Sequence, residues 1–241
     1  MWYEWQNSNL GKGWTNFVTH FIAQISPQCY GQNLLIFGFD YNINSISIKN
    51  KFYIHSSKIS KKTNILSNPN QLPFRNNSID CIICIHYLDM LDKAQIKPYL
   101  DEVHRVLVPY GKFITINFNP YGIWYLYHKF FKNFLPLDKK HTGISYIDLQ
   151  NYLEHGFSLK QANFALYQLA FQDKKYSKFY DKLNKMGNRW WPNLSNVYAM
   201  MFSKEVIGMH AITIEQEKAD NNYIIDILPA TNKNIKKNNI N

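Results

Sequence analysis

The stretch from Leu72 to Pro120 constrains the fold most, because it reads as a strand, a helix and a second strand. Ile79 to His86 is a continuous apolar run, which is typical of a strand covered on both faces. A helical pattern follows, with Pro98 placed in its first turn. Pro109-Tyr110-Gly111 then turns the chain into a second strand, Lys112 to Phe118. This βαβ unit predicts an α/β protein with a parallel sheet.

The order of short motifs in this stretch resembles a known family. The motifs are Leu72-Pro73-Phe74, then Asp80, then Glu102-x-x-Arg105-Val106-Leu107-x-Pro109-x-Gly111. They resemble the second half of class I methyltransferases that use S-adenosylmethionine (SAM). Three further segments resemble a small bacterial branch of that superfamily: Phe118-Asn119-Pro120-x-x-x-Trp124, Trp191-Pro192 and Val197-Tyr198. The resemblance implies a Rossmann-like fold, with a mostly parallel seven-stranded sheet and helices on both faces.

Length and composition fit one globular domain, since 46% of the 241 residues are apolar. We expect an aromatic segment and a helix over residues 1–30, with residues 1–14 irregular. The methyltransferase-like domain is expected over residues 31–215. Residues 216–241 are expected to be a polar, disordered tail. No apolar run reaches the ~18 residues that span a bilayer, and three cysteines make no disulfide framework. These features predict a cytoplasmic protein.

The charge balance favours anionic partners. The chain has 27 basic and 17 acidic residues, a net charge of +10, which suits nucleic acid or another anionic surface. No spacing of Cys, His and carboxylate residues suggests a metal site.

The resemblance implies SAM as the cofactor, at the carboxyl ends of the first and fourth strands. In the superfamily the first strand runs into a glycine-rich turn, and here only the first glycine remains, in Gly38-Phe39-Asp40-Tyr41-Asn42. The acidic residue that usually ends the second strand is absent, and Asn68 replaces an Asp after the third. These departures predict SAM binding that is weak or lost. The predicted cofactor-binding residues are Gly38, Phe39, Asp40, Ser56, Asn68, Leu72, Pro73, Phe74, His86 and Tyr87.

Polar residues after the fourth strand are the candidates for chemistry, because the family's active-site floor lies there. His86 is the candidate general base, and the alternative is a strand-end histidine bonded to backbone. Asp89 is a candidate for substrate contact, or alternatively a helix cap. The other predicted substrate residues are Asn117, Asn119 and Trp124.

An aromatic helix is predicted from Gly122 to Leu135, with apolar residues over half its circumference. One interpretation is packing on the sheet; the other is a surface for an apolar substrate or a membrane interface. Phe130 and Phe134 lie at the centre of the apolar arc and are predicted to be core. Trp124 and Leu135 lie at its margin and are predicted to face a cavity or solvent.

Two functions follow from these patterns. The first is a SAM-dependent methyltransferase with an unknown acceptor, for which an apolar small molecule is one candidate. The alternative is a non-catalytic, methyltransferase-like binding protein with a degenerate SAM pocket, acting through basic and aromatic surfaces. The direction in which Phe39 and Tyr41 point separates the two.

Overall fold

The structure is a computed structural model that describes residues 2–55, 65–131, 134–138, 143–167, 186–187 and 190–205. Within these residues the chain forms a seven-stranded sheet in the order β3-β2-β1-β4-β5-β7-β6. The strands are β1 (Asn33–Gly38), β2 (Asn50–His55), β3 (Ile65–Leu66), β4 (Ile79–Ile85), β5 (Leu107–Phe118), β6 (Phe157–Ala165) and β7 (Val197–Lys204). Ser56 and the predicted tail over 216–241 lie outside the described residues.

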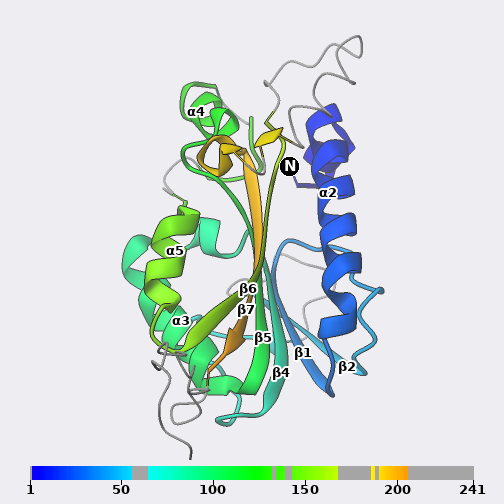
Figure 1. Cartoon of the computed structure of the whole chain (residues 1–241), viewed down its shortest axis with the longest axis vertical. Coiled ribbons are helices and arrows are strands. Elements are labelled where there is room, and N and C mark those ends of the chain that lie inside the picture. The colour runs from blue at the N-terminus through cyan, green and yellow to red at the C-terminus, as the bar shows by residue number, and fades with distance from the viewer. Residues whose placement is uncertain are drawn as a thin grey trace, which may run out of the picture. The chain divides into compact units, whose positions relative to one another are not determined.

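The predicted sheet is confirmed. The pairs β1–β2, β2–β3, β1–β4 and β4–β5 are parallel, and β7 runs antiparallel to both β5 and β6. Seen edge-on in Figure 1, helices lie on both sides of the sheet, with α2 (Asn9–Ile25) on one side and α3 (Lys93–Val106) and α5 (Tyr146–Leu153) on the other.

The N-terminal residues are helical, so the expectation of an irregular segment over 1–14 is wrong. Helix α1 (Trp2–Asn7) leads into α2, whose N-cap is Ser8. The Ser8 side chain accepts a hydrogen bond from the backbone N of Gly11, which satisfies a free donor of the first turn. In α2, Leu10, Trp14, Val18 and Phe21 are buried at spacings of four, four and three residues, and this helical pattern, which begins before residue 14, was the missed signal.

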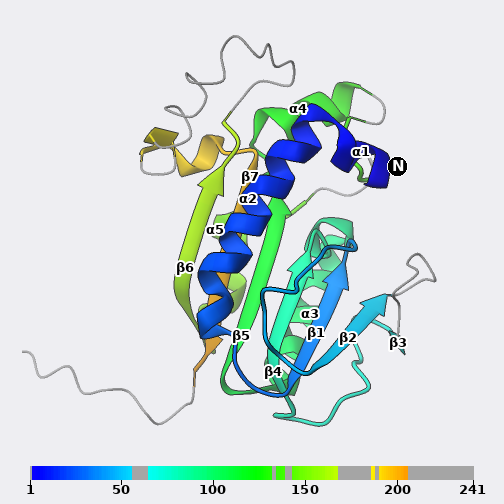
Figure 2. The same cartoon turned by 90° about the vertical axis from the view of Figure 1, so that its right-hand side faces the viewer.

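Helix α2 covers a face of the sheet that the chain's own crossover leaves open. Residues 39–49, all described, join the parallel strands β1 and β2 without a helix, although such crossovers usually contain one. Figure 2 shows α2 lying across the sheet instead. Its apolar side packs against β4, β5 and β7 together with four buried residues of the 39–49 connection, Tyr41, Ile43, Ile46 and Ile48.

On the opposite face, α3 begins earlier than the sequence pattern indicated. Its N-cap is Asp92, which forms a reciprocal capping box with Gln95. Pro98 therefore lies inside the helix, and its placement in the first turn is wrong. The predicted turn at Pro109-Tyr110-Gly111 lies inside β5, beside a register shift against β4. Tyr110 has a φ of 63°, a conformation that favours glycine.

Helix α4 (Ile123–Phe130) is shorter than predicted, and it faces the other way. Phe130 is 80% exposed, whereas Trp124 and Leu135 are fully buried, so the prediction is wrong for these three residues. Phe134, which was also predicted to be core, is partly buried and packs against the core. Trp124 is drawn inward because its backbone N donates to the side-chain oxygen of Asn196, 2.8 Å away. The prediction of a helix here is confirmed. Which of its apolar residues are buried depends on a hydrogen bond to Asn196, outside the helix.

Candidate active site

The carboxyl ends of β1, β4 and β5 meet through backbone hydrogen bonds. The N–H of Phe39 donates to the carbonyl of Ile85, and the N–H of His86 donates to the carbonyl of Ile116. Gly38 has a φ of 93°, and a Cβ there would lie 1.9 Å from the carbonyl oxygen of Ile85. Gly38 is therefore required for the close approach of β1 to β4. This junction is also the point where the strand order reverses, at which open α/β sheets bind ligands.

His86 stands at this junction and pairs with Asp89. The two side chains are fully buried, and Nδ1 of His86 lies 2.7 Å from Oδ2 of Asp89. The same carboxylate oxygen accepts a hydrogen bond from the backbone N of Phe118, 2.9 Å away. Asp89 lies in a short 3₁₀ turn, η2 (Leu88–Met90), which brings it back over the strand end. The pair therefore links the ends of β4 and β5.

The environment keeps His86 neutral and fixes its tautomer. Burial lowers the pKa of His86, and the hydrogen bond and charge of Asp89 act against this shift. A carboxylate can only accept, so Nδ1 carries the proton and donates a hydrogen bond to Asp89. Nε2 is then a free lone pair, and this buried atom has no hydrogen-bond partner among the described residues. An oriented, unprotonated imidazole is the arrangement of a general base.

Aromatic rings enclose the imidazole. Phe118 stacks on it with ring centroids 3.9 Å apart, and Trp14 lies 5.4 Å away. Trp2 and Phe39 stack on each other at 3.9 Å, and both lie within 6 Å of the imidazole. Sequence reasoning missed the contributions of Trp2, Trp14 and Phe118 to this site. The three tryptophans among the first 14 residues were the available signal.

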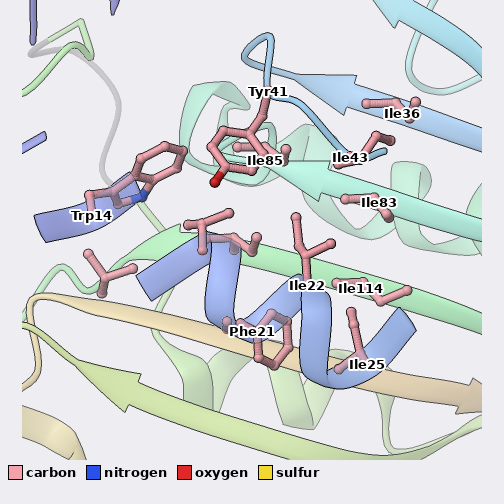
Figure 3. Close-up of a cluster of buried hydrophobic side chains, with 14 of the residues drawn as sticks. Trp14, Phe21, Ile22, Ile25, Ile36, Tyr41, Ile43, Ile83, Ile85 and Ile114 are labelled. Carbon is pink, nitrogen blue, oxygen red and sulfur yellow. The ribbon is translucent and has the colours of Figure 1, made fainter. Parts of the chain in front are cut away.

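Tyr41 points away from the site. Its hydroxyl donates to the backbone oxygen of Thr15, 3.1 Å away, and also bonds the hydroxyl of Thr19. Figure 3 shows its ring directed toward helix α2 and Trp14. Phe39, in contrast, lies beside His86. The two bulky residues of the turn therefore diverge, and Tyr41 is part of the core under α2.

The Leu72-Pro73-Phe74 segment is held by helix α3. Arg105 donates to the carbonyl oxygens of Leu72 and Phe74, at 3.1 and 2.9 Å. Glu102 accepts from the backbone N of Leu72 at 2.8 Å and pairs with Arg105. The two motifs, Leu72-Pro73-Phe74 and Glu102-x-x-Arg105, therefore occur together because the second binds the backbone of the first. Pro73 is exposed.

Two other predicted cofactor residues lie apart from His86. Asn68 is exposed, and its side-chain oxygen accepts from the backbone N of Asn70. Tyr87 is buried on the opposite face of the sheet, where its ring lies 5.1 Å from those of Phe37 and Tyr99. Asp40 follows Phe39 directly, and its charge contributes to the raised pKa of Tyr53 on β2, after burial.

Of the predicted substrate residues, only Asp89 contacts His86. The Asn117 side chain donates to the Thr115 hydroxyl. The Asn119 side chain donates to the carbonyls of Asn193 and Ser195, both at 2.9 Å. Trp124 is core. In the described part of the chain, no group of His, Cys, Asp and Glu residues could hold a metal ion, and no helix has the length and apolarity to cross a membrane.

Comparisons with known proteins agree with the fold. Residues 23–115 match the model of a family described as a methyltransferase domain, and no curated protein matches the chain. A SAM-dependent methyltransferase from Archaeoglobus fulgidus superposes with a TM-score of 0.57 at 15% identity, over 79% of this chain and 94% of its own.

Two further solved structures give similar values. A putative SAM-dependent methyltransferase from Listeria monocytogenes has a TM-score of 0.54 at 11% identity, over 81% of this chain and 100% of its own. A putative methyltransferase complexed with the Trm112 activator of Haloferax volcanii has a TM-score of 0.54 at 14% identity, over 82% of this chain and 92% of that one. These likenesses confirm the predicted class I fold.

Proposed function

We propose that this chain, which has the class I methyltransferase fold and a methyltransferase-domain match, is a SAM-dependent methyltransferase. The observation that supports this best is the His86–Asp89 pair. It places a buried imidazole nitrogen, unpartnered among the described residues, at the junction of β1 and β4. A polar atom in an apolar enclosure costs free energy unless a ligand satisfies it. Its retention there suits a binding site better than a structural core.

The residues around the junction fit SAM in three respects. Tyr41 turns toward α2 and does not occupy the end of β1. The backbone of Gly38, Phe39 and Asp40 lies where the superfamily resemblance places the cofactor. The aromatic rings beside His86 suit a cationic ligand as well as an apolar one. Bound SAM would supply an electrophilic methyl group carried on a sulfonium.

His86 would take up the proton that the acceptor releases. The acceptor's O–H or N–H bond breaks as Nε2 of His86 gains the proton, and the resulting imidazolium is stabilised by the Asp89 carboxylate. Asp89 also holds the ring in one orientation through Nδ1. The rings of Phe118, Trp14, Phe39 and Trp2 exclude water and favour an apolar acceptor. A cytoplasmic location belongs to the same proposal, since the cysteines Cys29, Cys81 and Cys84 are all free.

Calorimetric titration with SAM and with S-adenosylhomocysteine tests cofactor binding. A ligand at ~100 times its dissociation constant stabilises the fold by ~2.7 kcal/mol, so the melting temperature should rise. Transfer of a labelled methyl group to a panel of small phenols and amines then tests the reaction. His86→Asn should bind the cofactor as the wild type does and lose transfer by about 10²–10⁴-fold.

The alternative function, a non-catalytic methyltransferase-like binding protein, predicts the opposite result. A protein that lost its cofactor would show neither heat nor a thermal shift with millimolar SAM. That outcome would remove the enzyme proposal and leave a methyltransferase-like binding protein.

A further inference from the structure

The outer side of α4 exposes large apolar side chains. Phe130 is 80% exposed, Phe131 54% and Leu126 46%. These three residues, with Ile123 and Tyr127, line a shallow hollow of about 270 Å³. A single exposed Phe would need no explanation, but several large apolar side chains exposed together are typical of an interaction surface.

A second exposed apolar segment lies beside α4. Trp190, Trp191 and Leu194 are 66%, 47% and 61% exposed. The side chain of Asn119 joins the two segments, because it donates to the carbonyls of Asn193 and Ser195 and accepts from the backbone N of Tyr121. In Figures 1 and 2, α4 and the chain near residue 192 lie at the same end of the sheet. We define the aromatic rim as Tyr121, Leu126, Phe130, Phe131, Trp190, Trp191 and Leu194.

The two sequence stretches that supply the aromatic rim contain basic residues and no acidic ones. The sequence contains no Asp or Glu between residues 103 and 137 or between residues 182 and 204, the two stretches that supply the rim. Lys129 lies exposed in the last turn of α4. Residues 206–241 contain four Lys and four acidic residues, so the excess of ten positive charges belongs entirely to residues 1–205.

We propose that the aromatic rim docks on an anionic lipid bilayer. Trp and Tyr prefer the interface between headgroups and acyl chains, and Phe and Leu bury in the apolar layer below it. The basic residues of the two stretches, which contain no Asp or Glu, add attraction to anionic lipids. The rim begins at the carboxyl end of β5, where Phe118 contacts His86, so docking brings this end of the sheet to the bilayer. The inference does not depend on methyl transfer.

Co-sedimentation of the full chain with vesicles tests the proposal. Wild type should bind phosphatidylcholine vesicles that contain phosphatidylglycerol, and bind pure phosphatidylcholine vesicles less. Added salt should weaken the binding, because the electrostatic part is screened. The double substitution Phe130→Ser and Phe131→Ser should weaken it by about tenfold or more, since two buried aromatic contacts are lost.

A matched control removes two equally exposed apolar side chains elsewhere. Tyr30 and Leu66 are 69% and 60% exposed and lie before β1 and on β3. Tyr30→Ser with Leu66→Ser should bind vesicles as wild type does, and all three proteins should share one melting temperature. Absence of vesicle binding by wild type, or equal loss in both variants, would overturn the proposal. So would a dimer in sedimentation equilibrium that the Phe130/Phe131 variant alone dissolves, because a second copy would then cover the rim.

Discussion

His86 has a backbone φ of 55°, which is uncommon for a residue with a side chain. Strained conformations persist where surrounding contacts over-determine them, and they cluster at functional sites. Here the contacts are the hydrogen bonds that His86 donates, from Nδ1 to the Asp89 carboxylate and from its backbone N–H to the carbonyl of Ile116. Together these bonds hold the imidazole against Phe118. The bond to Asp89, which would orient His86 as a base, therefore also maintains its strained backbone conformation.

The lowered pKa of His86 predicts a pH dependence of stability. Because burial brings the folded pKa below 6.5, the unfolded chain binds more protons just below that pH. The contribution of His86 to the free energy of unfolding is therefore present above about pH 6.5. It is lost as the pH falls, by at most ~1.4 kcal/mol per pH unit. His86→Asn tolerates the positive φ and removes the titration. Urea unfolding between pH 7 and pH 5 should show a shallower decline for the variant; parallel curves would contradict the assignment.

Gly38 and Tyr110 predict opposite responses at two positions of positive φ. Gly38→Ala places a Cβ against the carbonyl oxygen of Ile85, so it should destabilise the fold by about 2–4 kcal/mol. Tyr110 is half exposed, and Tyr110→Gly should be neutral or stabilising by up to ~1 kcal/mol. The substitution removes the strain of a left-handed Tyr, and this gain slightly exceeds the extra conformational entropy that glycine loses on folding. Chemical denaturation measures both, and a tolerated Gly38→Ala would mean that β1 can move away from β4.

Residue patterns indicated His86 and Asp89 separately, yet could not pair them. Their contact depends on the turn at Leu88–Met90, and single-turn geometry is set by tertiary contacts rather than by local propensity. The departures from the glycine-rich turn after the first strand could be seen in the sequence itself. The enclosure by Trp2 was not, because it requires a helix more than 80 residues away along the chain from His86.

At the scale of elements, α4 shows that the periodicity of apolar residues predicts a helix but not which of its residues are buried. A helical pattern defines an apolar arc but not the neighbour against which it packs. Here the neighbour is the segment near Asn196, whose side chain binds the backbone of Trp124. Trp124, at the edge of the arc, is therefore buried, and Phe130, at its centre, is exposed.

The inversion in α4 predicts unequal costs for two aromatic truncations. Trp124→Ala empties a fully buried site beside Trp5 and should cost ~3–5 kcal/mol. Phe130→Ala removes an exposed ring and should stay within about 0.5 kcal/mol of wild type. Free energies of unfolding from denaturant titrations measure the difference. Equal costs would show that α4 packs through Phe130 in solution.

At the scale of the whole molecule, the parallel sheet was predictable because buried parallel strands read as unbroken apolar runs. The helix that covers it was not. In the usual crossover the covering helix follows its strand, and here α2 precedes β1 while residues 39–49 carry no helix. Trp14, Phe21, Ile22 and Ile25 near the N-terminus are part of the core.

This arrangement predicts that the two ends of the chain contribute very differently to stability. Trp14, Phe21, Ile22 and Ile25 of α2 are at most 2% exposed, and exposing them would cost about 6–12 kcal/mol, which is comparable with the whole stability of a domain. A chain lacking residues 1–28 should therefore lose its cooperative thermal transition. The seven strands of the described residues end by Lys204, so a chain ending at Gly208 should melt within a few degrees of the full protein. Calorimetry of both truncations against the full chain measures this. A cooperative transition after removal of residues 1–28 would show that the sheet buries this face without α2, and the role assigned here to the N-terminal helices would be wrong.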